Sequence, residues 1–140
     1  MKIRLMIACV VLMGSAAAQA PADDALYRGL GGQAGIGKIV ASVIPLIQAD
    51  ARIKEFFTDV DVPHLSAKLA EQFCALAGGP CVYKGKDMAT IHDGLNITNA
   101  QFNALAEDLQ AAMEQNGIAN AVQNKLVARL APMQRQIVTK

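Results

Sequence analysis

The sequence predicts an all-α protein, and three properties lead to that class. Hydrophobic residues make up 53% of the 140 residues, yet aromatic residues make up only 4% and tryptophan is absent. The apolar content is mostly Ala, Leu, Val, Ile and Met, which is more typical of packed helices than of a sheet. Apolar residues recur at helical spacing, and no run follows the two-residue period of a strand. The length suits one domain with a real core.

The helical segments follow one another with short breaks. We expect them at residues 23–32, 36–50, 51–57, 61–76, 88–92, 98–115 and 120–138. Acidic residues begin the first segment and glycines end it. The second is apolar on most faces, which predicts a buried central helix, and Pro45 inside it should kink the helix or shift its hydrogen bonds. The third is one or two turns that end in Phe56 and Phe57.

Capping signals bound the later helices. Asp61 should cap the fourth segment, with Pro63 in the first turn, where proline costs least. The sequence AGGP at residues 77–80 then ends that helix, and a loosely structured stretch leads to the short helix 88–92. Thr98 and Gln101 form a capping-box pattern for the next helix. Pro132 should interrupt the last one.

The first residues read as a cleaved signal peptide. Lys2 and Arg4 precede the apolar run LMIACVVLM, and small residues follow it, which together predict export with cleavage after Ala18. The expected domain is therefore 19–140, in the periplasm or secreted. Removing the two basic residues from the 13 in the chain leaves 11, against 12 acidic residues. This near-neutral charge argues against nucleic acid or an anionic membrane as a partner.

Export changes the interpretation of the cysteines. Cys9 leaves with the signal peptide, so the mature chain keeps only Cys74 and Cys81. In an oxidising compartment these two can close a small loop through ALAGGP, and we predict a disulfide. The alternative is a metal or redox pair, but the spacing is not C-x-x-C and no histidine lies beside it.

His92 is one of two histidines in the chain. A histidine at the end of a short helix is often placed there only by the helix dipole. However, the fourth helix carries Leu65, Leu69 and Phe73 on one face, and this face and His92 could line two sides of a flat slot. Haem requires apolar walls, an imidazole for its iron and cations at the rim. Local pattern alone leaves both interpretations open.

A resemblance to a known family favours the second interpretation. The stretches LYRGLGG, ADARIKEFF, LAGGPCVYKGKDM and IHDGLNIT occur in this order and spacing in group I truncated haemoglobins, and the similarity runs over residues 26–138. The resemblance implies a shortened globin fold, in which two pairs of helices form a two-over-two sandwich around haem b. It also implies that His92 is the proximal iron ligand. The other haem contacts that it implies are Phe57, Leu65, Leu69, Phe73, Tyr83, Lys84, Lys86 and Met88.

The distal side departs from the family pattern. Many members stabilise bound oxygen with a tyrosine and a glutamine, and the matching residues here are Ile44 and Leu69. Neither side chain can donate a hydrogen bond, so oxygen affinity should suffer more than that of carbon monoxide. Lys68 lies where some members place an iron-binding side chain. It either binds the iron as a neutral amine or extends to a haem propionate or to solvent. His64 is a weaker candidate, because it should point toward the rim.

The expected function is binding of the diatomic ligands O2, NO and CO at haem iron in the cell envelope. Nitric oxide or redox chemistry, with a reductase as partner, fits the apolar distal side better than oxygen storage does. If Lys68 binds the iron, electron transfer becomes the better interpretation. A different class, a haem-carrying or haem-free binding module without gas chemistry, is distinguished by whether bound haem depends on His92.

Overall fold

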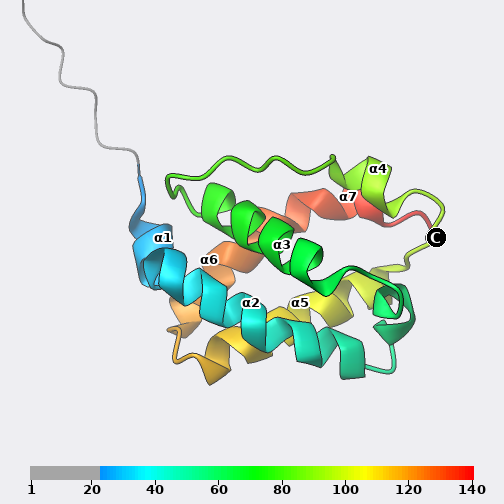
Figure 1. The fold of residues 1–140 in the computed structure, drawn as a ribbon, viewed down its shortest axis with the longest axis horizontal. Helices are drawn as coiled ribbons and strands as arrows, with labels where there is room; N and C mark the ends of the chain where they lie inside the picture. Colours follow the sequence, from blue (N-terminus) through cyan, green and yellow to red (C-terminus); the bar gives the residue numbers. More distant parts are fainter. Residues whose placement is uncertain (1–22) are drawn as a thin grey trace, which may run out of the picture.

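The computed structural model describes residues 23–140, and this part of the chain is helical (Figure 1). Its elements are α1 (Ala25–Gly29), α2 (Gly32–Ala49), η1 (Lys54–Phe57), α3 (Val62–Leu76), α4 (Met88–His92), α5 (Asn99–Gln115), α6 (Asn120–Leu130), η2 (Ala131–Met133) and α7 (Gln134–Ile137), where η denotes a 3-10 helix. The α2 helix packs on α3 and on α5, and α5 packs on α6. Within residues 23–140 the only β pairing is an isolated bridge between Ile97 and Val138. The all-α prediction is confirmed.

The α2 helix forms the centre of the core. Six of its apolar side chains are buried: Ile36, Ile39, Val40, Val43, Ile44 and Ile47. The helix continues through Pro45, and it begins at Gly32 rather than at the expected residue 36. Glycine is unfavourable inside a helix, so the glycines at residues 32 and 35 give no local sign of this earlier start. Gly35 lies so close to the carbonyl of Leu30 that a Cβ atom would collide with it, so the tight packing at this turn requires glycine.

An ionic cluster fixes the segment that follows α2. The guanidinium of Arg52 lies 2.7 Å from Asp50 Oδ2 and 2.6 Å from Glu107 Oε2 on α5. The hydrogen bonds from Arg52 lower the pKa of the Asp50 carboxyl, while burial raises the pKa of the neighbouring Asp108 carboxyl. Because η1 begins two residues after Arg52, the cluster helps to hold Phe56 and Phe57 in place.

The α3 helix begins and ends as the sequence predicts. The Asp61 side chain accepts a hydrogen bond from the backbone N–H of His64 at 3.0 Å, and Pro63 lies in the first turn. Gly78 follows the helix with a φ of 79°, and a Cβ atom there would collide with the backbone of Asp23.

The predicted pairing of the cysteines occurs in the structure. Cys74 in α3 and Cys81 beyond it form a disulfide whose Cα atoms are 5.8 Å apart. Cys74 is fully buried. The bond therefore ties α3 to the loop of residues 81–87, which has no regular structure and leads directly into α4.

Side-chain caps fix α4 and α5. The Asp87 carboxylate accepts hydrogen bonds from the backbone N–H of Thr90 at 2.9 Å and from its hydroxyl at 2.7 Å. The predicted capping box of Thr98 and Gln101 is present at the start of α5. These caps satisfy N–H groups that have no partner within the helix.

The C-terminal segment returns to α4. The predicted break at Pro132 divides the final helix into α6, η2 and α7. The α7 helix packs on α4, and the backbone N–H of Thr139 donates to the carbonyl of Ile97 at 3.0 Å. The chain end therefore supports the segment that carries His92.

The predicted signal peptide, residues 1–18, lies outside the described residues. Between residues 23 and 140, none of the helices combines the length and the apolar character needed to cross a membrane.

Candidate functional site

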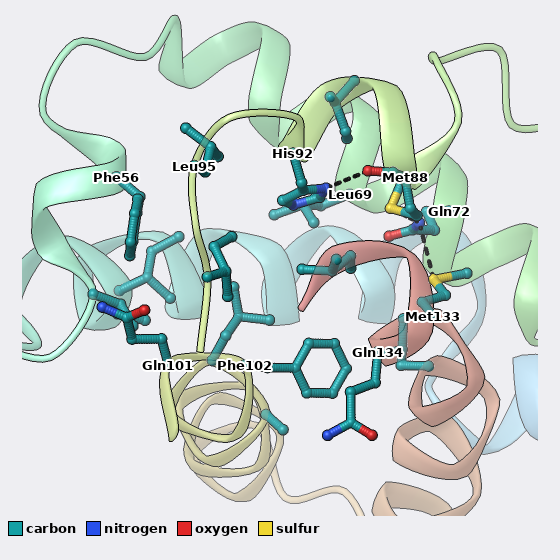
Figure 2. A pocket seen from close by; sticks show the side chains of 18 of the residues that line it. Phe56, Leu69, Gln72, Met88, His92, Leu95, Gln101, Phe102, Met133 and Gln134 are labelled. Atoms are coloured by element: carbon teal, nitrogen blue, oxygen red, sulfur yellow. Dashed lines mark hydrogen bonds between the residues drawn. The ribbon is translucent and has the colours of Figure 1, made fainter. Parts of the chain in front are cut away.

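A cavity of about 430 Å³ lies between α3 and α4, and its floor comes from α5, η2 and α7 (Figure 2). Its size falls within the range of about 300–1,000 Å³ that is typical of small-molecule and cofactor sites. Most of the lining side chains are aliphatic, aromatic or thioether groups, among them Phe57, Leu65, Leu69, Phe73, Met88, Leu95, Phe102, Met133 and Ile137.

His92 is the last residue of α4 and reaches the cavity from one side (Figure 2). Its ring nitrogen Nδ1 lies 2.7 Å from the backbone oxygen of Met88. A carbonyl oxygen can only accept a hydrogen bond, so Nδ1 carries a proton, which in the neutral tautomer leaves the lone pair on Nε2. Histidines that bind metals usually have their second ring nitrogen held in this way. The ring is therefore prepared to bind a metal through Nε2.

The opposite wall comes from one face of α3. Leu65, Leu69 and Phe73 are spaced four residues apart, which places them on the same side of the helix, and all three line the cavity. Phe57 and Met88 line it as well. Ile44 lies elsewhere: it is buried in the core, and Ile47, one turn later in α2, reaches the cavity instead.

Lys68 lines the cavity at its rim. The lysine Nζ lies 2.9 Å from Glu71 Oε2, and the side chain keeps 25% of its surface exposed. The hydrogen bond from Lys68 lowers the pKa of the Glu71 carboxyl, and the backbone N–H of Lys84 adds to this effect. His64 is exposed and does not line the cavity.

The loop before α4 contributes one side chain to the cavity. Tyr83 lines it and donates a hydrogen bond from its hydroxyl to the backbone oxygen of Lys86 at 2.9 Å. Burial raises the pKa of the Tyr83 hydroxyl. The side chains of Lys84 and Lys86 are exposed and do not line the cavity.

The C-terminal half of the chain also contributes to the cavity wall, which the sequence pattern did not indicate. Phe102, Met133 and Ile137 line the cavity from α5, η2 and α7. Met133 and Ile137 are four residues apart, which is the one signal that could have indicated an apolar face on the last helix.

The donor set indicates what kind of ligand fits. In the described part of the chain, no group of three or more His, Cys, Asp or Glu side chains could hold a bare metal ion. One imidazole with a free Nε2 faces an apolar slot, and a lysine lies at the rim. These residues fit a flat apolar group that carries a metal ion and itself supplies most of the ligands of that metal. Haem has these properties. The fold and the site thus define a helical haem-binding protein.

Comparisons with known proteins agree with this class. The family described as bacterial-like globin matches residues 25–139, and the chain belongs to this family. The group 1 truncated hemoglobin of Tetrahymena pyriformis is 35% identical over 100 residues, which make up 71% of this chain and 83% of that protein. A group 1 truncated hemoglobin of Mycolicibacterium paratuberculosis is 29% identical over 81% of this chain and 84% of its own length.

The same fold occurs in solved structures. The crystal structure of the Tetrahymena pyriformis truncated hemoglobin in its Fe(III) form matches with a TM-score of 0.79 and 31% identity, over 82% of this chain and 98% of that one. The two-over-two globin fold predicted by the resemblance is confirmed, and membership of a globin family implies haem as the cofactor.

Proposed function

We propose that this protein holds one haem b through His92 and binds diatomic gases in an apolar pocket. The observation that carries the proposal is the hydrogen bond from His92 Nδ1 to the Met88 carbonyl, which leaves Nε2 directed to metal binding beside an apolar slot. Haem supplies an iron that can take up a small gas molecule or an electron. The protein relatives named as hemoglobins support this assignment.

The chain's own residues define the environment of the gas. Leu65, Leu69 and Phe73 exclude water from the α3 side of the slot and offer no hydrogen bond. When O2 is bound it carries partial negative charge and gains about 1 kcal/mol from each hydrogen bond in a pocket, whereas CO gains much less. The proposed pocket therefore suits nitric oxide or redox chemistry better than oxygen storage.

A hydrogen-bond donor introduced at residue 69 should reverse this preference. In Leu69→Gln we expect the affinity for O2 to rise about fivefold, since one hydrogen bond contributes about 1 kcal/mol. The affinity for CO should change less than about twofold, because CO is a poor acceptor. Gas binding to the ferrous protein after flash photolysis measures both values.

The variant Leu69→Met is the matched control, because it keeps an apolar side chain of similar volume and adds no donor. Its ratio of O2 to CO affinity should remain that of the wild type. If Leu69→Gln changes both gases equally, or changes neither, residue 69 does not face the gas and the proposed pocket polarity is wrong.

We also propose that the protein acts in the periplasm or outside the cell, after cleavage of residues 1–18. The Cys74–Cys81 disulfide supports an oxidising compartment, where such bonds persist. Redox chemistry at the haem would require an electron donor, and we propose a reductase as the partner. The mature protein isolated from the envelope should have a mass that corresponds to residues 19–140.

Lys68 raises a second candidate function, which is electron transfer by haem with two protein ligands. The observation in its favour is that Lys68 lines the cavity on the side opposite His92. To bind iron its amine must lose a proton and leave Glu71, which now lies 2.9 Å away.

The variants Lys68→Met and Glu71→Gln separate the two candidates. Methionine keeps much of the apolar stem of lysine and removes the amine, and the gas-binding proposal expects an unchanged ferric absorption spectrum. Electron transfer instead predicts a low-spin wild type that becomes high-spin in Lys68→Met. Glu71→Gln, which releases the lysine from its ion pair, should then increase the low-spin fraction.

A further inference from the structure

The polar side chain buried most closely against the site is Gln72 of α3. It is 8% exposed, and among residues 23–140 only Gln123 is a similarly buried polar side chain. Gln123 donates to the backbone oxygen of Ile118 at 2.8 Å, which is an ordinary partner. Gln72 Nε2 instead lies 3.3 Å from Met88 Sδ and 3.6 Å from Met133 Sδ. Thioether sulfurs are weak acceptors, so the carboxamide is buried at some cost.

These contacts join three separate parts of the fold (Figure 2). Gln72 belongs to α3, which forms the wall opposite His92, Met88 begins α4, and Met133 ends η2. A methionine side chain is flexible and adapts readily to its surroundings. The Gln72 amide contacts both sulfurs, so it restrains the Met88 and Met133 side chains more than apolar packing alone would.

The restraint continues to the iron-binding ring. The backbone oxygen of Met88 accepts the hydrogen bond from His92 Nδ1 at 2.7 Å. Gln72 thus contacts the side chain of the residue whose backbone orients the imidazole. The α4 helix is only five residues long, and the Asp87 cap acts at the same end. Its orientation therefore depends on contacts at this end and on its packing against α7.

We propose that Gln72 is a positioning residue for His92, acting through Met88. The carboxamide holds Met88 from the opposite wall, and the Met88 carbonyl in turn holds the imidazole with Nε2 toward the slot. An apolar side chain at residue 72 would release Met88, and the ring would lose part of its fixed orientation. The inference rests on the proposed function, in which His92 binds the haem iron.

The test uses the full haem-loaded protein and the variants Gln72→Leu and Gln72→Met. Leucine and methionine have side-chain volumes close to that of glutamine, but neither side chain can donate a hydrogen bond. In the ferrous protein without gas, resonance Raman spectra should show the iron–histidine stretching band shifted to lower frequency. Haem transfer to an excess of apomyoglobin should be about fivefold faster, which corresponds to one hydrogen bond. Circular dichroism confirms that the variants are folded.

Gln123→Leu is the matched control. Gln123 is the other buried glutamine among residues 23–140, but it donates to the backbone oxygen of Ile118 at 2.8 Å and does not line the cavity. This variant should keep the wild-type iron–histidine band. Met88→Leu should reproduce the shift seen in Gln72→Leu, and the double variant should show little further change, because both residues act through one contact.

Three results would overturn the inference, and they differ from one another. If both Gln72 variants keep the wild-type band and rate of haem loss, Gln72 does not position His92. If they shift the C–O stretching band of the CO complex and leave the iron–histidine band unchanged, the carboxamide contacts the gas instead. If the wild type binds haem without an iron–histidine band, the proposed role of His92 fails, and this inference fails with it.

Discussion

His92→Ala should lose haem at least about 100-fold more readily than the wild type. The substitution removes the imidazole that lines the cavity, and we assign about 3 kcal/mol or more to the lost bond to iron. The fold should persist, because His92 makes its hydrogen bond only to Met88 of its own helix. Transfer of haem to apomyoglobin, followed by absorbance, measures the change.

Two controls make this result specific. His64→Ala removes the other histidine, which is exposed and outside the cavity, and should leave haem retention unchanged. Imidazole added to His92→Ala should restore part of the binding, since it can occupy the space of the lost ring. A His92→Ala protein that retains haem as the wild type does would refute the assignment of the ligand.

Removal of the Cys74–Cys81 disulfide should cost about 2.5 kcal/mol of unfolding free energy. The estimate follows from the chain entropy of a closed loop of roughly eight residues. For a domain of this size it corresponds to a decrease in melting temperature of roughly 10 °C. Thermal unfolding of the double variant Cys74→Ala, Cys81→Ala, compared with the oxidised wild type, measures the effect.

Reductant provides the matched test on the unaltered chain. It should lower the melting temperature of the wild type and have no effect on the double variant, which lacks the bond. Because the disulfide joins α3 to the loop before α4, haem retention should fall in parallel. Identical unfolding curves for oxidised and reduced protein would show that the bond adds no stability.

The parts of the fold that depend on local chemistry could be predicted from the sequence. The Asp61 cap, Pro63 in the first turn of α3 and the capping box of Thr98 with Gln101 depend on residues within three positions of each other, and all occur in the structure. The break at Pro132 is of the same kind, because proline lacks the N–H that a helix interior requires. The resemblance to truncated haemoglobins supplied the arrangement of these helices.

The register of α2 toward the cavity could not be predicted. This helix is apolar on most faces, so its pattern does not show which residues face the core and which the cavity. Ile44 was expected in the pocket, whereas Ile47 lines it. Ile44 and Ile47 lie three residues apart, which is about one helical turn. Only the packing of α2 against α3 and α5 determines which of the two faces the cavity.

Two other features of the site depend on contacts distant in sequence. Ile137 reaches the cavity because α7 packs on α4, about 45 residues away along the chain, and Met133 ends η2, directly before α7. The partner of Lys68 depends on side-chain rotamers and on the loop that brings the Lys84 N–H to Glu71. Neither arrangement leaves a pattern in the local sequence.

The absorption spectrum of the purified wild-type protein is the most direct test of whether His92 holds haem in this cavity. We would record the spectrum of the ferric protein and then of the reduced protein at neutral pH, and count haem per chain after extraction into alkaline pyridine. We expect one haem b per chain and a five-coordinate ferrous spectrum with a histidine ligand. A protein that is colourless as isolated, and that leaves the spectrum of added haemin unchanged, would contradict it.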